Sequence, residues 1–157
     1  MERRTIASGT EWESAAGYSR AVRVGPHVTI SGTTTTDADG EVVAGEAYAQ
    51  TARAIANVES ALAEAGAELA DVVRTRMYVT DIEKWEAIGG AHAEAFGEIR
   101  PATTMVEVSR LIAPELCVEI EADAIVAGAT EDADDTDGCD HDEYSGGSAG
   151  EDADGIH

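Results

Sequence analysis

The sequence predicts an α+β domain in which one β-sheet is covered on one face by two helices. Residues 72–79 and 116–126 alternate between two faces, as strands do. Residues 48–65 instead carry apolar side chains at intervals of three and four, which is typical of an amphipathic helix. The segments follow one another as strand, strand, helix, strand, helix, strand, strand, and this order favours a mixed sheet with crossover helices.

The first strands are short. Residues 18–24 and 28–31 are strand-like runs separated by the turn Gly25-Pro26-His27. Residues 37–40 read Asp-Ala-Asp-Gly, which is turn chemistry, and lead into a short strand at residues 42–43.

The first long helix begins near Glu46, where the helix dipole favours an anion. Gly66 is placed to end this helix in a left-handed conformation. One apolar stripe runs along it: Tyr48, Thr51, Ile55, Val58, Leu62 and Ala65.

The strand at 72–79 precedes a second helix. One face of the strand presents Val73, Thr75, Met77 and Val79, and the other presents Val72, Arg74, Arg76 and Tyr78. Thr80 and Glu83 have the spacing of a capping box that opens the helix. Its expected packed face carries Trp85, Ile88, His92 and Phe96.

Two strands complete the predicted sheet, at residues 102–108 after Pro101 and at residues 116–126. In the last strand Leu116, Val118, Ile120, Ala122 and Ala124 face one way, and Cys117, Glu119, Glu121 and Asp123 face the other. The uncovered face of the sheet should therefore carry Arg74, Arg76, Glu119 and Glu121. A half-polar face of this kind meets either water or another subunit.

Charge divides the 157 residues into two parts. The net charge is −22, and half of it lies in residues 129–157, which contain 11 acids and no base. We therefore expect a folded domain at residues 1–128, with a core of small residues, and a disordered acidic tail at residues 129–157. A domain with a net charge of −11 lacks the cationic surface that binds nucleic acid or anionic membranes.

Composition also suggests an environment. No apolar run is long enough to span a membrane and no secretory signal is visible. The two cysteines form no disulfide framework, so we expect a cytoplasmic protein. Lys84 is the only lysine in this acid-rich chain, which favours a halophilic protein. A mesophilic acidic protein, with arginines that reflect a GC-rich genome, remains the alternative.

Periodicity and motif spacing do not by themselves reveal an active site. The sequence has no metal-ligand cluster, phosphate-binding loop or dinucleotide fingerprint, and we expect no metal or cofactor. Cys139-Asp140-His141 is a weak metal pattern, and a solvated tail explains it better. His92 is interpreted as a half-buried packing residue and Cys117 as an inert thiol.

Several phrases nevertheless resemble the Rid/YjgF family, the reactive-intermediate imine/enamine deaminases. They occur in order over residues 3–127: Gly17-Tyr18-Ser19, Ile30-Ser31-Gly32, Ile55-Ala56-Asn57-Val58, Asp71-Val-Val-Arg-Thr75, the run from Arg100 to Val108, and Val118-Glu-Ile-Glu-Ala122.

The resemblance implies a chorismate-mutase-like fold assembled as a homotrimer. The sheets would form a central barrel with the helices outside, and three small-molecule clefts would lie between subunits. Such clefts hydrolyse 2-imino and enamino acids to 2-keto acids and ammonia without a cofactor. Carried over by motif, Glu119 is the water-positioning glutamate, Tyr18 bounds the cleft, and Gly32 ends the Ser-Gly strand.

One departure from the family pattern affects the expected activity. The deaminase motif reads Pro-Ala-Arg, and that arginine binds the substrate carboxylate, but here Thr103 follows Pro101 and Ala102. The chain thus resembles the arginine-lacking Rid subgroups. Met105 stands where the family often has a cysteine, and Thr103 and Thr104 would donate hydroxyl hydrogen bonds to the ligand.

Two readings follow from this departure. In the first, the protein is a deaminase-like hydrolase whose substrate need not be an α-carboxylate, and Arg76 or Arg100 supplies positive charge. In the second, it is a non-catalytic binding or regulatory homologue. The structural alternative for Arg76 is an ion pair with Glu119 or Glu121. The ribonuclease role attributed to some family members is disfavoured by the negative domain.

Overall fold

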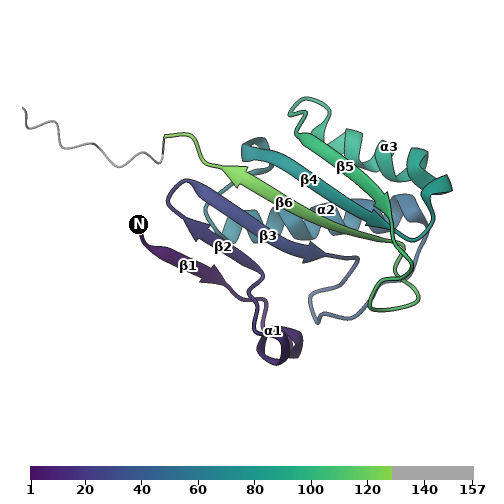
Figure 1. The fold of residues 1–157 in the computed structure, drawn as a ribbon, viewed down its shortest axis with the longest axis horizontal. Coiled ribbons are helices and arrows are strands. Elements are labelled where there is room, and N and C mark those ends of the chain that lie inside the picture. Colours follow the sequence, from purple (N-terminus) through teal and green to yellow (C-terminus); the bar gives the residue numbers. More distant parts are fainter. Residues whose placement is uncertain (129–157) are drawn as a thin grey trace, which may run out of the picture.

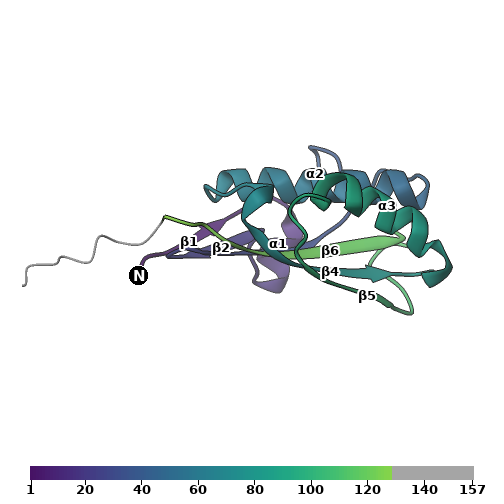
Figure 2. The same ribbon diagram turned by 90° about the horizontal axis from the view of Figure 1, so that it is seen from above.

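The computed structural model describes residues 1–128, which form one six-stranded sheet with two long helices on one face (Figures 1 and 2). The order of the strands in the sheet is β1-β2-β3-β6-β4-β5. The strands are β1 (Arg3–Ile6), β2 (Ala21–Val24), β3 (His27–Thr33), β4 (Val72–Val79), β5 (Ala102–Glu107) and β6 (Val118–Ile125). The helices are α1 (Glu11–Ala16), α2 (Ala47–Glu64) and α3 (Trp85–Phe96), with 3-10 turns η1 (Leu69–Asp71) and η2 (Ile82–Lys84).

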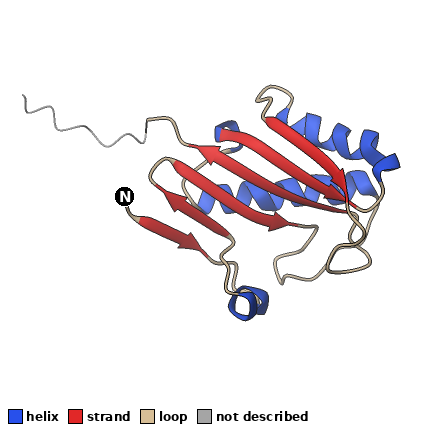
Figure 3. Ribbon diagram, viewed as in Figure 1, coloured by secondary structure: helices blue, strands red, loops and turns tan. Residues whose placement is uncertain are grey.

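The predicted α+β class and the two covering helices are confirmed. All neighbouring strands are antiparallel except β4 and β5, which are parallel and joined through α3 (Figure 3). Figure 2 shows α2 and α3 on the same side of the sheet, which leaves the other side open. The expected acidic tail lies outside the described residues. None of the helices in residues 1–128 is long and apolar enough to cross a membrane.

The end of α2 follows the sequence prediction. Gly66 has φ 77°, the left-handed conformation expected after the last helical turn. The Ala67 amide donates to the Leu62 carbonyl and the Gly66 amide donates to the Ala63 carbonyl, which is the Schellman pattern of hydrogen bonds. This end of the helix is also held by Arg23, whose Nη1 donates to the Ala65 carbonyl at 2.7 Å.

Two N-terminal elements were not predicted. β1 has the sequence Arg-Arg-Thr-Ile and α1 spans only six residues, so neither carries a readable hydrophobic period. The first predicted strand is also shorter than expected, because β2 begins at Ala21 and leaves Tyr18 and Arg20 before it. The expected strand at residues 42–43 is only a single bridge between Thr36 and Val42.

The start of β4 differs from the predicted alternation. Val72 is buried and Val73 is exposed, the reverse of the prediction, whereas Thr75, Met77 and Val79 are buried as expected. The register with β6 shifts between Val72 and Arg74. Such an irregularity exchanges the two faces of a strand, because the side-chain period is two.

The predicted capping box is wrong. The side chain of Asp81, rather than Thr80, accepts a hydrogen bond from the Glu83 amide, and it opens η2 instead of α3. α3 begins only at Trp85, whose side chain is exposed instead of lying on the packed face. Ile88 and Phe96 are buried as predicted and His92 is half-buried.

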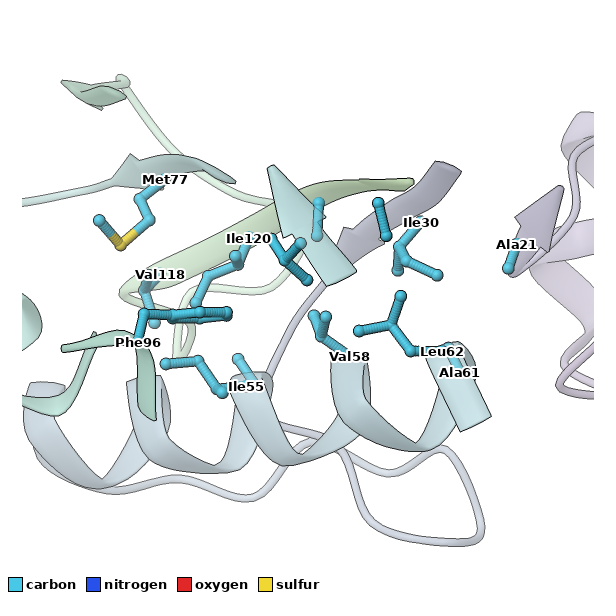
Figure 4. Close-up of a cluster of buried hydrophobic side chains, with 14 of the residues drawn as sticks. Ala21, Ile30, Ile55, Val58, Ala61, Leu62, Met77, Phe96, Val118 and Ile120 are labelled. Atoms are coloured by element: carbon cyan, nitrogen blue, oxygen red, sulfur yellow. The ribbon is translucent and has the colours of Figure 1, made fainter. Parts of the chain in front are cut away.

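The core lies between α2, α3 and the sheet, and small residues make up much of it, as expected. Nine of the 22 buried hydrophobic residues are alanines, so the backbone of α2 can lie close to the strands. Larger side chains from both layers interlock there, among them Ile55, Val58 and Leu62 of α2 with Ile30 and Ile120 of the sheet (Figure 4). Each such side chain contributes about 1.5–3 kcal/mol when buried.

Candidate functional site

The open face of the sheet carries charged side chains from two neighbouring strands, β4 and β6. Along β4 and β6 the register pairs Arg76 with Glu121 and Tyr78 with Glu119. The alternation of β6 is as predicted: its apolar residues are buried, and Cys117, Glu119, Glu121 and Asp123 are partly exposed. The predicted polar face is therefore real, and Glu119 lies on it.

A bulge in β3 brings Gly32 against Glu119. The pairing of β3 with β6 shifts between Ile30 and Thr33, so Ser31 and Gly32 occupy the irregular position. A Cβ atom on Gly32 would lie 2.9 Å from the carboxyl carbon of Glu119 and would overlap its Oε1. A larger residue at position 32 would therefore force the Glu119 carboxylate to move out of the space that it occupies.

Arg20 holds this bulge in place. Its Nη2 donates hydrogen bonds to the Ser31 carbonyl, to the Gly32 carbonyl at 2.9 Å and to the Thr33 Oγ1 at 2.6 Å. The Arg20 Nε is buried without a hydrogen-bond partner within residues 1–128. Sequence reasoning missed Arg20, because it looked for cations only on β4 and before β5. The available signal was an arginine two residues after Tyr18, at the start of a strand.

The environment of Glu119 disfavours its charged form. Burial raises the pKa of the Glu119 carboxyl, the nearby Glu121 carboxylate raises it further, and the Arg20 guanidinium opposes both. The pKa of Tyr78, its cross-strand neighbour, is also raised, first by burial and then by the Glu121 carboxylate. A carboxyl group with a raised pKa at an irregular point of a sheet is suited to accept and return a proton.

Tyr18 is on the same side of this cluster. It lies near Arg20, which it precedes by two residues, and its side chain is 43% exposed. Tyr18, Arg20, Gly32 and Glu119 form what we call the Glu119 cluster.

The β5 candidates lie elsewhere. Thr103 pairs with Thr75 in the β4–β5 register, and their hydroxyl oxygens are 2.8 Å apart on the helix-covered side of the sheet. Met105, two residues on, shares that side, whereas Thr104 pairs with Arg76 on the open side. Thr103 is exposed, since β5 is the edge strand.

The fold of the single chain does not bring the two groups together. β4 lies between β5 and β6, so Thr103 and Glu119 are two strands apart, roughly 10 Å, and on opposite sides of the sheet. Most of the predicted site residues thus fall into two partly exposed sets, Tyr18, Gly32 and Glu119 in the Glu119 cluster and Thr103 with Met105 at the edge.

Arg76 is already paired on the open face. Its Nη1 lies 3.2 Å from Asp123 Oδ2 and 3.6 Å from Glu121 Oε2. This is the structural alternative named for Arg76, with Asp123 as an additional partner. Arg100, the other candidate cation, is exposed at the loop before β5 with φ 56°, a conformation that costs a non-glycine residue energy.

The remaining candidates, His92 and Cys117, are half-buried at the edge of the core. Burial lowers the pKa of His92, whose ring lies 4.6 Å from that of Phe96, and burial raises the pKa of the Cys117 thiol. Within residues 1–128 no group of three or more His, Cys, Asp or Glu could hold a metal ion. A hollow of about 540 Å³ between α2 and the preceding loop is lined by other residues, including Val43, Ala52 and Asn57.

Comparisons with known proteins place this fold. The family described as Endoribonuclease L-PSP matches residues 8–126. A RutC family protein from Pyrococcus abyssi is 40% identical over 106 residues, covering 67% of this chain and 83% of that protein. A Salmonella typhimurium protein named 2-iminobutanoate/2-iminopropanoate deaminase is 30% identical over 125 residues, covering 78% of this chain and 97% of that protein.

A solved structure gives the same answer. A Mycobacterium tuberculosis member of the YjgF/YER057c/UK114 family is 57% identical and superimposes with a TM-score of 0.74, covering 80% of this chain and 100% of that chain. The match spans nearly all of the described residues, including both halves of the candidate site. The chain therefore belongs to the Rid/YjgF/RutC family, also described as the L-PSP family.

Proposed function

We propose that the protein is a homotrimeric, deaminase-like hydrolase that converts an imine or enamine to a carbonyl compound and ammonia. Its cleft would lie between subunits. The two exposed sets of candidate residues support this arrangement, because the Glu119 cluster of one subunit can face the Thr103 edge of the next. A closed three-fold ring would repeat that contact three times.

Glu119 carries the proposed chemistry. Its carboxylate accepts a proton from water while the water oxygen bonds to the imine carbon, and the electron pair of the C=N bond moves to nitrogen. The resulting carbinolamine loses ammonia as its C–N bond breaks and the hydroxyl proton leaves, which yields the carbonyl product. Glu119 first returns the water proton to the nitrogen, which gives the carbinolamine, and the proton that leaves the hydroxyl goes to the departing nitrogen. One imine and one water thus give one carbonyl compound and one ammonia without a cofactor.

The single observation that carries this proposal is the apposition of the Glu119 carboxylate and Gly32. Arg20 holds the bulge by hydrogen bonds, and the bulge leaves the space that the Glu119 carboxylate fills. Burial raises the pKa of Glu119. The deaminase name of the Salmonella relative agrees with this chemistry. Tyr18 would bound the cleft, and Thr103, Thr104 and Met105 would contact the ligand.

The alternative is a small-molecule-binding or regulatory protein without catalytic activity. Thr103 favours this alternative, because a neutral hydroxyl cannot replace a bidentate clamp: each hydrogen bond to a charged group contributes about 1.5–3 kcal/mol. An endoribonuclease activity is disfavoured by the net charge of −11 on residues 1–128. The acidic, lysine-poor composition supports a cytoplasmic protein of a halophile.

The test couples the protein to a threonine dehydratase, which generates 2-iminobutanoate in solution. Formation of 2-oxobutanoate is followed with and without the protein, at salt concentrations from low to molar. Acceleration that Glu119→Gln abolishes would support the hydrolase, and no acceleration at high protein concentration would favour the binding protein. Size-exclusion chromatography with light scattering should give the mass of a trimer.

A further inference from the structure

A line of three polar side chains runs from the interior to the exposed edge of the sheet. The His92 Nε2 lies 2.9 Å from the Thr75 Oγ1, and the Thr75 Oγ1 lies 2.8 Å from the Thr103 Oγ1. The Thr103 hydroxyl in turn donates to the Pro101 carbonyl at 3.1 Å. We call His92, Thr75 and Thr103 the threonine relay.

The three side chains of the relay come from three different elements and differ widely in their exposure to solvent. Thr75 of β4 is fully buried, His92 of α3 is half-buried, and Thr103 of β5 is exposed. A buried polar group is unfavourable unless it is hydrogen-bonded, and a valine would fill the space of Thr75 at no such cost. Packing therefore does not account for the two threonines and the imidazole.

Counting hydrogens favours one direction for the relay. Burial keeps the His92 ring neutral by lowering its pKa, so one ring nitrogen donates and the other accepts. If the Nε2 donates to Thr75, then Thr75 donates to Thr103, and the Thr103 hydrogen is free for Pro101. In the reverse direction the Thr103 hydroxyl donates its one hydrogen to the Thr75 oxygen. The Pro101 carbonyl then accepts no hydrogen bond from Thr103.

We propose that His92 and Thr75 are positioning residues that make the exposed Thr103 hydroxyl a hydrogen-bond donor to an oxygen of the ligand. This inference rests on the proposed function, since it concerns the same cleft. The ligand then places an acceptor oxygen beside Thr103. This oxygen replaces the Pro101 carbonyl as the acceptor of the Thr103 hydroxyl, which is a single neutral donor. Such a site accepts a carbonyl or amide oxygen as readily as a carboxylate, unlike a guanidinium clamp.

The direction of the relay can be measured without any ligand. In ¹⁵N-labelled protein, at a pH where His92 is neutral, the ring nitrogen shifts report which nitrogen carries the hydrogen. We expect the Nε2–H form, and we expect Thr103→Val to shift the ring toward the Nδ1–H form, because Thr75 then donates back to His92. An Nδ1–H ring in the unaltered protein would overturn the proposal.

Two substitutions of His92 separate positioning from packing. His92→Phe keeps an aromatic ring beside Phe96 and removes the donor, whereas His92→Gln keeps an N–H and loses the ring. With 2-oxobutanoate as the probe, we expect His92→Phe to weaken binding about fivefold and His92→Gln to restore most of it. A pure packing role predicts the reverse order, and that result would reject the relay.

The two proposals can fail separately. If 2-oxobutanoate does not bind the unaltered protein, the ligand assigned under the proposed function is wrong, and the ring nitrogen shifts still decide the direction of the relay. If the probe binds and both His92 variants bind it equally well, the proposed cleft stands and the positioning role is rejected.

Discussion

The carboxyl group of Glu119 lies directly against Gly32, at a bulge where even a single methyl group on the glycine would overlap it. This contact joins the last strand to β3. It brings the glutamate expected from the family resemblance to the glycine of the Ser-Gly motif.

Gly32→Ala should displace Glu119. The added methyl group has to push away the carboxylate or distort the bulge, so we expect a loss of about 1–3 kcal/mol in unfolding free energy and at least a tenfold loss of turnover. Gly45→Ala is the matched control, because a Cβ there meets only Ala49 at 3.8 Å. Equal activity of the two variants in the coupled assay would contradict the role given to Gly32.

Glu119→Gln should lower activity about 100-fold or more, since the general base is lost. The same change should slightly raise the melting temperature at neutral pH. The fold raises the pKa of this carboxyl, so stability is lost as pH rises from its unfolded to its folded pKa, and glutamine removes that loss. A melting temperature that falls instead would show that the ionised carboxylate stabilises the fold.

Glu121→Gln tests the acid limb of the pH profile. Activity should fall as the pH drops through the raised pKa of Glu119, because protonation removes the base. The Glu121 carboxylate contributes to that raised pKa, so its removal should move the acid limb to lower pH while activity at neutral pH is retained. An unmoved limb would indicate that another group controls the profile.

Arg20→Gln should destabilise the bulge and move the acid limb of the pH profile in the direction opposite to that expected for Glu121→Gln. Three acceptors lose a charged donor, which we expect to cost about 2 kcal/mol of unfolding free energy. Without the guanidinium the pKa of Glu119 should rise further, and the acid limb should move to higher pH. Arg53→Gln on the exposed side of α2 serves as the control in denaturant titrations and pH profiles.

Thr103→Arg should restore a carboxylate clamp. We expect at least about a tenfold gain in kcat/KM for 2-iminobutanoate, since two charge-assisted hydrogen bonds replace one neutral bond. Val106→Arg places the same cation on the open side of β5, where Val106 pairs with Tyr78, and should give no gain. No gain from Thr103→Arg would mean that the edge of β5 does not face the substrate carboxylate.

Arg76→Ala distinguishes the two roles considered for this residue. Because Asp123 and Glu121 already neutralise the guanidinium, we expect affinity for 2-oxobutanoate to be nearly unchanged. The partly exposed ion pairs should contribute less than about 1 kcal/mol to stability, and less still at high salt. A tenfold loss of affinity in a folded protein with an unchanged oligomeric state would instead support Arg76 as the cation of the cleft.

Much of the fold could be predicted because it depends on local periodicity. The stripe on α2, the left-handed Gly66 and the alternation of β6 all follow from neighbouring residues. The errors occurred where a single residue decides the geometry. The register shift in β4 exchanged Val72 and Val73, and Asp81 took the capping position expected for Thr80.

The sequence by itself determined the order of the helices and strands from β2 onward, the polar face of the sheet, the family, and the presence of a threonine in place of an arginine at position 103. Each of these follows from residue spacing or residue identity. Only the tertiary structure decided which side chains meet. Arg20 reaches Gly32 through a bulge, and His92 reaches Thr103 through Thr75. Such contacts depend on strand register and on which side of the sheet each side chain occupies, and neither is set by local propensity.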